Sequence, residues 1–345
     1  MNKKLIFLLL ATLVLVGSLI GCGPGETPAE APTAENGAET PAPAPATDEI
    51  VHISIGTAPA GGDFYNTGVL IADILNQELS NYRVNAEPTD AAVDNIRRMQ
   101  RGEMEMGFTY AANVYWAVRG EQIFDGEEIP LDILIATTTA PWHLMVRADS
   151  GIDSWADLAG KRIAGVPAGG LVGWIIIDRS LEFYGMTRDD LAAMPAVTNL
   201  PDMIEEIKAG DFDGIVWPFP VRGAPAFIDL GATTDLKWIS MEEDHMDYIL
   251  EELPFLSKVT IPAGSNEGQP MDFTCVAEIT LVMIRPDLDE QVVYEITEAL
   301  AKNLHRFEEL SVAGKEVTLE RAVAVKDVLS YHPGAVKYYQ EQGVW

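Results

Sequence analysis

Two short glycine-rich stretches have the composition and position of ligand-binding loops. Gly61-Gly62 and Ala168-Gly169-Gly170 each stand between a predicted strand and a predicted helix. At such a junction the first backbone N–H groups of the helix lack acceptors, and the helix dipole is positive. Glycine also lets the backbone approach a ligand closely. The pattern predicts a small anion-binding cradle at each loop, unless these glycines only form tight turns.

Aromatic residues follow the predicted strands at matching places. Thr109-Tyr110 ends one strand, and Trp217-Pro218-Phe219-Pro220 ends another. A helix terminus contributes about 0.3–1 kcal/mol to binding an anion, whereas micromolar affinity needs about −8 kcal/mol. Burial of aromatic surface must therefore supply part of the affinity. We predict that these residues line the site; the alternative is that they belong to the core.

No catalytic or metal-binding constellation is visible. The five histidines never occur at His-x-x-x-His spacing, and Gly-x-Ser-x-Gly is absent. Asp211-Phe212-Asp213-Gly214 hints at a calcium loop, but Arg222 stands where a bidentate Glu is required. We expect no cofactor, no metal and no enzymatic activity.

Composition limits the classes of partner. The 345 residues include 53 acidic and 23 basic side chains, for a net charge of −30. Binding to nucleic acid through bulk charge needs clustered Lys and Arg, so that class is excluded. With 48% hydrophobic residues the chain is too apolar to be disordered throughout. Two cysteines exclude a disulfide-built scaffold.

The N-terminus predicts export and lipid attachment. Lys3 and Lys4 precede an apolar run, as in a signal peptide of residues 1–21. Leu19-Ile20-Gly21-Cys22 resembles the lipobox of bacterial lipoproteins, in which the cysteine receives a diacylglycerol and further acylation such as palmitate. Residues 22–49 are rich in Ala, Pro and Glu and lack aromatic residues, so we expect a disordered tether to the membrane.

The remainder predicts an α/β body. Val51–Ile55, Met104–Thr109 and 162–164 read as strands, and Thr67–Leu79 and Val172–Tyr184 as helices, with Asn66 as a candidate N-cap. Strands that alternate with helices favour mostly parallel sheets.

An offset of 108 residues superposes two parts of the chain. Ile55 falls on Ile163, and the Gly61-Gly62 pair falls on Gly169-Gly170. Asp94 falls on Asp202 and Gly102 on Gly210, and an acid-x-acid pair follows each glycine. The order of features predicts two copies of one α/β unit with a cleft between them. Chance similarity of helices and turns is the alternative.

Longer motifs resemble a known family. They are Ile55-Gly56-Thr57 with Gly61-Gly62-Asp63-Phe64-Tyr65, then residues 101–108, 158–165 and 261–265, and the tail His332-Pro333-Gly334-Ala335-Val336-Lys337-Tyr338-Tyr339. Together they resemble the solute-binding receptors of tripartite ATP-independent periplasmic (TRAP) transporters, in the TAXI subgroup.

The resemblance implies a type II periplasmic-binding-protein fold, in which two α/β lobes close on a solute. Lobe I would comprise 50–142 and 272–345, and lobe II 143–271. The segments crossing between lobes would lie near Ala136–Val146 and Phe273–Ile284. A long helix over Asp287–Leu310 would pack on the first lobe through Val293, Ile296, Leu300, Leu304 and Phe307.

The resemblance also assigns ligand contacts. Its first loop would supply Thr57, Gly61, Gly62 and Tyr65, and the remaining contacts would come from the set already named: Thr109, Tyr110, Ala168, Gly169, Gly170, Trp217 and Phe219. This chain has fewer hydroxyls and more aromatic surface there than the family pattern. We therefore expect a carboxylate-bearing organic acid with an apolar or aromatic part, with Arg147, Arg162 and Arg222 as weaker candidates to pair with it.

The resemblance implies delivery of the solute to a TRAP-type permease by a lipoprotein anchored through Cys22 outside the cytoplasm. A sensory protein that presents its ligand to a membrane histidine kinase needs the same closing cleft and stays open as an alternative. An enzyme on this fold would need an acid–base pair in the cleft.

Overall fold

The computed structural model describes residues 50–60, 63–166, 170–218, 225–266, 269–310 and 312–345. Residues Asp48–Trp345 form one compact unit. The predicted signal peptide, the acylated Cys22 and the tether lie outside the described residues, as do Gly61, Gly62, Ala168, Gly169 and Phe219. These expectations stay predictions.

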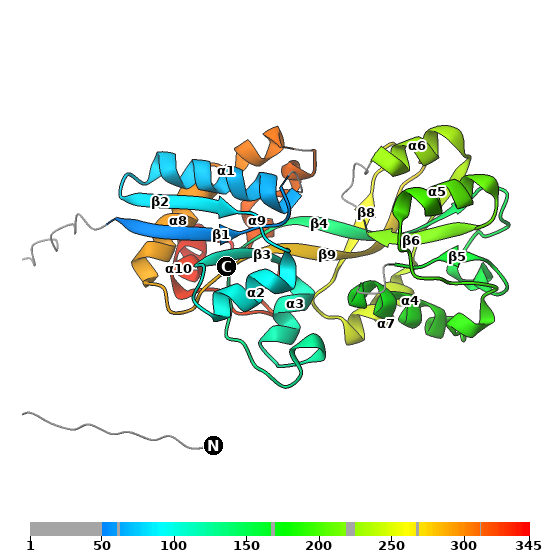
Figure 1. The fold of residues 1–345 in the computed structure, drawn as a ribbon, viewed down its shortest axis with the longest axis horizontal. Coiled ribbons are helices and arrows are strands. Elements are labelled where there is room, and N and C mark those ends of the chain that lie inside the picture. The colour runs from blue at the N-terminus through cyan, green and yellow to red at the C-terminus, as the bar shows by residue number, and fades with distance from the viewer. Residues whose placement is uncertain (1–49, 61–62, 167–169, 219–224, 267–268, 311) are drawn as a thin grey trace, which may run out of the picture. The chain divides into compact units, whose positions relative to one another are not determined.

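The described residues form a nine-stranded sheet in the order β2-β1-β3-β9-β4-β6-β5, with β7 beside β4 and β8 beside β9. Its strands are β1 (Val51–Gly56), β2 (Tyr82–Glu87), β3 (Met106–Tyr110), β4 (Asp132–Arg147), β5 (Ile163–Ala164), β6 (Gly214–Pro218), β7 (Leu236–Ile239), β8 (Ser257–Ile261) and β9 (Phe273–Ile284). Figure 1 shows β4 and β9 running from the elements around β1–β3 to those around β5–β7. They are the two crossing segments that the sequence predicts.

Pairing in the sheet is mixed, so the expectation of mostly parallel sheets is wrong. β1 pairs in parallel with β2 and β3, and β5 with β6. β9 is antiparallel to β3, β4 and β8, and β4 is antiparallel to β6 and β7. The cause is that β4 and β9 run in opposite directions and both extend from one end of the sheet to the other. Each of them forms antiparallel pairs with the other and with further strands. The predicted α/β fold class with two α/β parts is confirmed.

Helices cover both faces of the sheet. They are α1 (Asp63–Glu78), α2 (Ala92–Gln100), α3 (Ala111–Ala117), α4 (Leu171–Phe183), α5 (Leu200–Ala209), α6 (Pro225–Thr233), α7 (Glu243–Glu252), α8 (Glu290–Lys302), α9 (Leu319–Ala322) and α10 (Pro333–Glu341). Single 3-10 turns include Leu304–Glu309 and Val312–Glu316. None of the helices among the described residues has the length and apolar character to cross a membrane.

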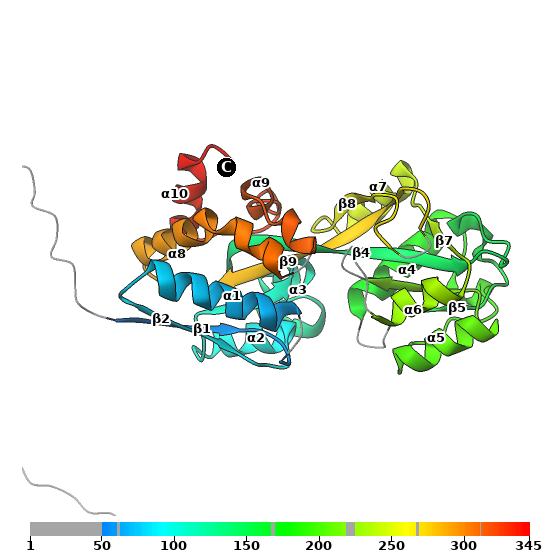
Figure 2. The same ribbon diagram turned by 90° about the horizontal axis from the view of Figure 1, so that it is seen from above.

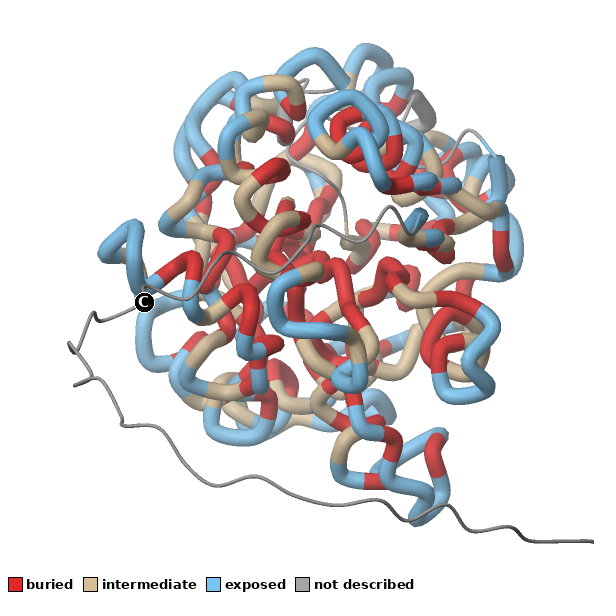
Figure 3. The backbone as a smooth tube through the Cα atoms, turned by 90° about the vertical axis from the view of Figure 1, so that its left-hand side faces the viewer, coloured by how far each residue is buried: buried red, intermediate tan, exposed pale blue. Residues whose placement is uncertain are grey.

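Alternating side chains of the strands fill two cores. On β4, Leu144 and Val146 join the core beneath α4 and α7, whereas Met145 joins the core beneath α5 and α6. This alternation follows from the pleat of a strand, which points successive side chains to opposite faces. Figure 1 shows α5 and α6 on one side of these strands and α4 and α7 on the other. Buried residues, red in Figure 3, lie inside, and most outer turns are exposed.

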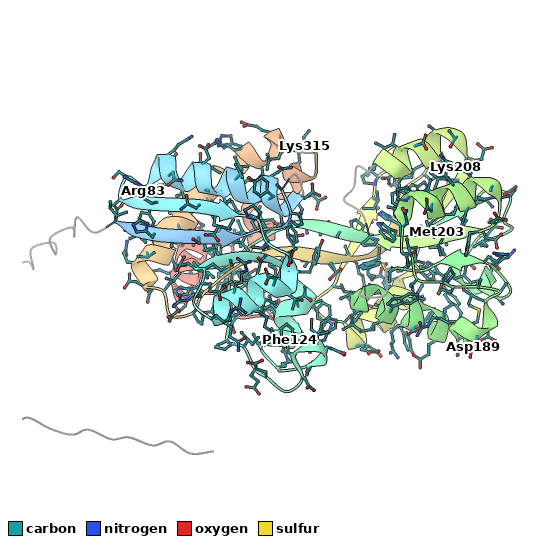
Figure 4. All side chains as sticks on the ribbon, viewed as in Figure 1. Arg83, Phe124, Asp189, Met203, Lys208 and Lys315 are labelled. Carbon is teal, nitrogen blue, oxygen red and sulfur yellow. The ribbon has the colours of Figure 1, made fainter. Side chains whose placement is uncertain are left out.

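Helix α5 shows how one helix divides its residues between core and solvent. Met203 is buried, with Ile204 and Ile207 on the same face. Lys208 lies outside and forms ion pairs with Glu205 of its own helix and with Asp229 of α6. Both Met203 and Lys208 are labelled in Figure 4. The apolar face therefore fixes α5 on the sheet, and the half-buried lysine on its other side joins α5 to α6.

Two helix predictions need correction. Helix α1 begins at Asp63, so Asn66 lies inside the first turn and is not the N-cap. The expected helix over Asp287–Leu310 is interrupted after Lys302. There Asn303 leaves helical geometry, and its amide donates to the Ala299 carbonyl at 2.9 Å. Its predicted inward residues are nevertheless buried, except Leu304, which is half-buried.

Helix α8 joins the C-terminal tail to the rest of the fold. It packs against α1 and α10, as Figure 2 shows. His332 caps α10 by accepting from the Gly334 N–H at 3.2 Å, and its other ring nitrogen lies 3.1 Å from the Leu288 carbonyl. A Cβ at Gly334 would lie 2.2 Å from the Glu290 carbonyl oxygen. The distinctive tail motif thus serves close packing of α10 on α8.

The 108-residue repeat is confirmed in the register of the strands. Ile55 pairs with Met106 in one copy, and Ile163 pairs with Gly214, each exactly 108 residues later, in the other. The starts of α1 and α4, of α2 and α5, and of β3 and β6 differ by the same offset. Chance similarity does not reproduce pairing register, so the two units share one construction.

One side-chain hydrogen bond recurs in both copies. The Ser54 N–H donates to the Glu105 carboxylate at 2.8 Å, and the Arg162 N–H donates to the Asp213 carboxylate at 2.8 Å. These are the second acids of the two acid-x-acid pairs. Each carboxylate thus connects the start of its unit, at β1 or just before β5, to the residue that precedes the last strand, β3 or β6.

Gly210 and its counterpart Gly102 end α5 and α2 with φ of +86° and +71°. We expect Gly210→Ala and Gly102→Ala each to lower the free energy of unfolding by about 1–2 kcal/mol, because a Cβ is strained in this left-handed region. Urea unfolding at equilibrium measures the loss. Gly210→Asn should recover part of it, because Asn tolerates this conformation better. Unchanged stability of Gly210→Ala would contradict the prediction.

Candidate ligand-binding site

A cavity of about 420 Å³ lies where α1, β3 and the two crossing strands meet. Its size falls within the range of about 300–1,000 Å³ that is usual for small-molecule sites. The lining residues come from elements far apart in the sequence: Ala58, Asp63, Phe64, Asn66, Thr67, Ala91, Ala92, Phe108, Tyr110, Thr137, Thr138, Thr139, Ala140, Pro218, Thr280 and Leu310. Most belong to the first unit and the crossing strands, and Pro218 comes from the second unit.

A β-bulge forms the floor of the cavity. Ala136 pairs with Leu281 and Thr139 with Ile279, so two residues of β4, Thr137 and Thr138, lie opposite one residue of β9, Thr280. The Thr137 hydroxyl donates to the Thr280 carbonyl at 3.3 Å. A bulge interrupts the alternation of side chains and re-aims them. It explains why three consecutive threonines, 137–139, all reach one cavity.

A carboxylate of the C-terminal region forms hydrogen bonds with the bulge. The Thr139 hydroxyl and backbone N–H donate to the Glu316 carboxylate at 2.7 and 3.3 Å. The Arg321 guanidinium lies 3.8 Å from the same carboxylate. The position of Thr139 at the cavity therefore depends on residues near the end of the chain.

Three aromatic rings form one wall. The Phe64 ring lies 5.3 Å from the ring centroids of both Phe108 and Tyr110, and it stacks on Phe108 at 24°. Phe108 and Tyr110 point to the same face of β3 because they are two residues apart. Burial, with the nearby Glu278 and Asp63 carboxyls, raises the pKa of Tyr110. Tyr110 is therefore a neutral hydrogen-bonding group beside an apolar surface.

Asn95 fixes the loop and strand that carry this wall. Its amide donates to the Thr57 and Phe108 carbonyls at 2.8 Å each, and its carbonyl accepts from the Thr89 hydroxyl at 2.7 Å. The side chain is fully buried. A Cβ at Gly56 would lie 2.5 Å from the Asn95 carbonyl oxygen, so the glycine permits this approach. The network holds the end of β1 against β3.

Ala91, at the cavity edge, has strained backbone geometry. Its φ of 69° and ψ of −175° lie in a region that glycine alone adopts readily. Residues with such geometry concentrate at binding sites, where the surrounding structure holds them. The small side chain leaves this edge of the cavity open.

A buried carboxyl lies beside the floor. Glu278 pairs with Ala140 across β4 and β9 and is 6% exposed. Its burial raises the pKa of Glu278 to about 8, against the opposing effect of the Trp142 side chain. None of the described residues forms an ion pair with it within 4 Å. In the free protein at neutral pH, Glu278 is therefore mostly uncharged.

The residues predicted from the sequence have different places around this cavity. Tyr110 lines it directly. Thr57 is fully buried and its hydroxyl donates to the Glu87 carbonyl at 2.7 Å, while Tyr65 is half-buried on α1. Thr109 is fully buried and accepts from the Asn113 amide at 3.1 Å. Their direct contact with a ligand stays a prediction.

In the second unit, Gly170 is the half-buried residue before α4. Trp217 is half-buried and packs against the core beneath α5 and α6, away from the cavity lining. Gly61, Gly62, Ala168, Gly169 and Phe219 lie outside the described residues. Neither of the two described candidates of this unit, Gly170 and Trp217, is among the residues that line the cavity.

The arginine candidates are engaged elsewhere. Arg147 forms a bidentate pair with Asp149 at 2.9 and 2.7 Å. The Arg162 guanidinium lies over the Phe212 ring at 5.1 Å, and Arg222 lies outside the described residues. No described residue that lines the cavity is basic. The described residues also contain no cluster of His, Cys, Asp or Glu that could hold a metal.

Sequence reasoning missed the polar floor. Thr137, Thr138, Thr139 and Thr280 lie in segments that were predicted only to cross between lobes. A run of three threonines within an otherwise apolar strand was the available signal, because a buried strand is usually a continuous apolar run. Glu278 gave the same signal: it is the one acid in the apolar Phe273–Ile284 segment.

We expect Asn95→Ala to lower the free energy of unfolding by about 2–4 kcal/mol, because it removes three buried hydrogen bonds. The Thr89 hydroxyl and the Thr57 carbonyl then keep the bond of 3.0 Å between them. Thermal or urea unfolding measures the loss. Asn303→Ala removes a single half-buried amide bond and serves as the matched control, with a loss of about 1 kcal/mol. Equal losses in the two variants would contradict a central role for Asn95.

Stability of the ligand-free protein should fall relative to Glu278→Gln as pH rises from about 5 to 8. Over this range the unfolded chain ionises Glu278 while the folded protein keeps its proton, so the slope is at most about 1.4 kcal/mol per pH unit. Burial lowers the pKa of His143 to about 3 and that of His245 to about 4. Both destabilise the fold below about pH 6.5 in either protein, and their effect cancels in the difference. Parallel stability curves would contradict the prediction.

Several solved structures are similar to this chain at low sequence identity. The alkanesulfonate-binding protein SsuA from Xanthomonas axonopodis pv. citri, solved with MOPS, matches with 14% identity over 85% of this chain and 84% of its own, at a TM-score of 0.43. A putative periplasmic sulfonate-binding protein from Methylobacillus flagellatus KT matches with 14% identity over 85% of this chain and 78% of its own, at a TM-score of 0.47. A putative L-cystine ABC transporter protein from Listeria monocytogenes matches with 14% identity over 79% and 98%, at 0.40.

A family model matches residues 55–343, which include the cavity and nearly every element described above. The chain belongs to the NMT1-like family.

Proposed function

We propose that this protein is an extracytoplasmic solute-binding lipoprotein, which captures a small organic acid by closure of two lobes and delivers it to a TRAP-type secondary transporter. The observation that carries the binding role is the cavity at the β4–β9 bulge. Its lining draws on both units and on both crossing strands. A ligand bound there would contact both units and both crossing strands, which are the elements that move relative to one another when two lobes close.

Chemistry of the cavity supports a small, partly apolar ligand. The wall of Phe64, Phe108 and Tyr110 offers aromatic surface, and the threonine floor offers hydroxyls that both donate and accept. We propose that the ligand carboxylate meets the backbone N–H groups at the starts of α1 and α4, where Gly61, Gly62 and Gly169 stand in the sequence. The apolar part of the ligand would then lie on the aromatic wall.

The N-terminal sequence supports the proposed location. A signal peptide over 1–21, acylation of Cys22 and a tether over 22–49 would hold the body outside the cytoplasm and near a permease. Residues 50–345 carry 21 basic and 47 acidic side chains, so anionic headgroups would repel the body. The resemblance to TAXI-type receptors supports the choice of a TRAP permease as the partner.

Calorimetry on the chain without residues 1–21 tests the binding role, with glutamate and a panel of aliphatic and aromatic acids. We expect at least one acid with an apolar part to bind at micromolar affinity. Thr280→Val should weaken that binding by about 3- to 100-fold, because it removes one hydroxyl contact to a neutral or charged group. Thr233→Val on α6, outside the cavity, should leave it unchanged.

Uptake of the identified solute by cells that lack the gene tests the transport role. Deletion should abolish uptake, and reintroduction should restore it, whereas Cys22→Ser should impair attachment to the membrane. Binding without any change in uptake would favour a sensory role. No binding by any compound would contradict the proposed function.

A further inference from the structure

Glu278 occupies the part of β9 that passes from one end of the sheet to the other. Pairing of β9 with β3 ends at Thr280, and its pairing with β8 begins at Ala277. Glu278 lies between these ladders and pairs only with Ala140 of β4. Ala140 and Thr280 both line the cavity. Since residues two apart on a strand share a face, the Glu278 side chain points to the cavity side of β9.

Both ends of the sheet supply its neighbours. Tyr110, at the end of β3, interacts electrostatically with the Glu278 carboxyl. Trp142, on β4, lies beside it on the other side and packs against α4, where a Cβ at Gly173 would lie 2.4 Å from the Trp142 ring. The carboxyl therefore lies near Tyr110 and near Trp142, and the Trp142 ring reaches α4 of proposed lobe II.

None of the described residues supplies this carboxyl with a compensating charge. It is 94% buried, and no Lys, Arg or His of the described residues lies within ion-pair distance. A buried, unpaired carboxyl is costly to retain, and its replacement by an apolar residue would stabilise most folds. A ligand that supplies the missing charge is a physical reason to keep it.

Its surroundings favour a cation over a second anion. Asp63, at the start of α1, is the one charged residue among the described lining residues. The faces of Phe64, Phe108 and Tyr110 attract positive charge through their π electrons. The strongly acidic body also attracts cations and repels anions at long range.

We propose that Glu278 is a specificity-determining residue, whose carboxylate binds a positively charged nitrogen of the solute at the junction of β4 and β9. The proposal rests on the proposed function and adds a second recognition element to it. The solute then carries a cationic nitrogen together with its apolar part. Where the solute also has a carboxylate, that group lies at the starts of α1 and α4.

Binding of a cation to Glu278 is coupled to loss of its proton. In the free protein the carboxyl is mostly protonated at pH 7, since burial raises its pKa to about 8. Among the described residues, the groups close to it are Tyr110 on β3 and Trp142 on β4, and the nearest acids around the cavity are Asp63 on α1 and Glu316, which accepts from Thr139. None of these is basic. A cation must therefore displace the Glu278 proton, so about one proton is released at pH 7 and affinity rises from pH 6 to 8.

The test uses matched compounds on the chain without residues 1–21. One set is phenethylamine, 3-phenylpropanoate and phenylalanine, and a second is pentylamine, hexanoate and norleucine. We expect thermal stabilisation by amine-bearing members. Glu278→Gln should weaken that binding at least about 30-fold, because truncating one partner of a buried charge pair costs 2 kcal/mol or more. Glu295→Gln on α8, away from the cavity, is the matched control.

Calorimetry at pH 7 in phosphate and in Tris counts the protons. We expect about one proton released with the wild type and none with Glu278→Gln, whose fold is checked by its melting temperature. Stabilisation by the acids alone, or affinity that falls as pH rises, would mean that protonated Glu278 donates to an anion and would overturn the proposal. In that case the proposed function stands. Failure of every compound to bind would count against both.

Discussion

The antiparallel pair of β4 and β9 is the constraint on which the rest of the molecule depends. These two strands contribute to both ends of the sheet, and every other strand except β1, β2 and β5 pairs with one of them. Their ladder has two register shifts, and at the second of them Thr137 and Thr138 oppose Thr280. The cavity forms at that interruption. A movement of one unit against the other must therefore involve residues that line the cavity.

The two units are built alike, and in each the end of one crossing strand forms the same hydrogen bond with the residue before β3 or β6. The Arg285 N–H donates to the Glu105 carbonyl at 3.0 Å, and the Arg147 N–H donates to the Asp213 carbonyl at 2.8 Å. Each arginine then forms a bidentate pair with the aspartate two residues on. Exposed pairs contribute little stability, so their repetition reflects shared geometry. The shared geometry places equivalent helix starts next to the crossing strands.

Patterns of local origin were predictable from the sequence, and long-range effects were not. The α/β class and the repeat followed from periodicity and glycine spacing near residues such as Gly102 and Gly210, and the crossing segments followed from the family resemblance. The mixed direction of the sheet did not follow, because strand direction depends on where a distant partner lies. Nor did the floor of the site, since a bulge depends on the pairing of two strands about 140 residues apart. Trp217 was predicted to line the site but packs against a core. Its position at the end of a strand could not distinguish these two places, because aromatic residues at strand ends occur in both cores and cavities.

The free protein carries unfavourable features that converge on one place. Ala91 has a backbone conformation costing about 1–3 kcal/mol, and Glu278 is buried without a countercharge from any residue that the structure describes. Both adjoin the cavity, whereas the surrounding cores are continuous and apolar. A fold selected for stability alone would replace each of them at little cost to its packing. From their position beside the cavity, we expect occupancy of the cavity to affect the stability of the crossing strands, because a ligand that neutralises Glu278 would remove a penalty located between the two units. If the proposed function holds, binding would then stabilise the junction itself, as closure of two lobes on a solute requires.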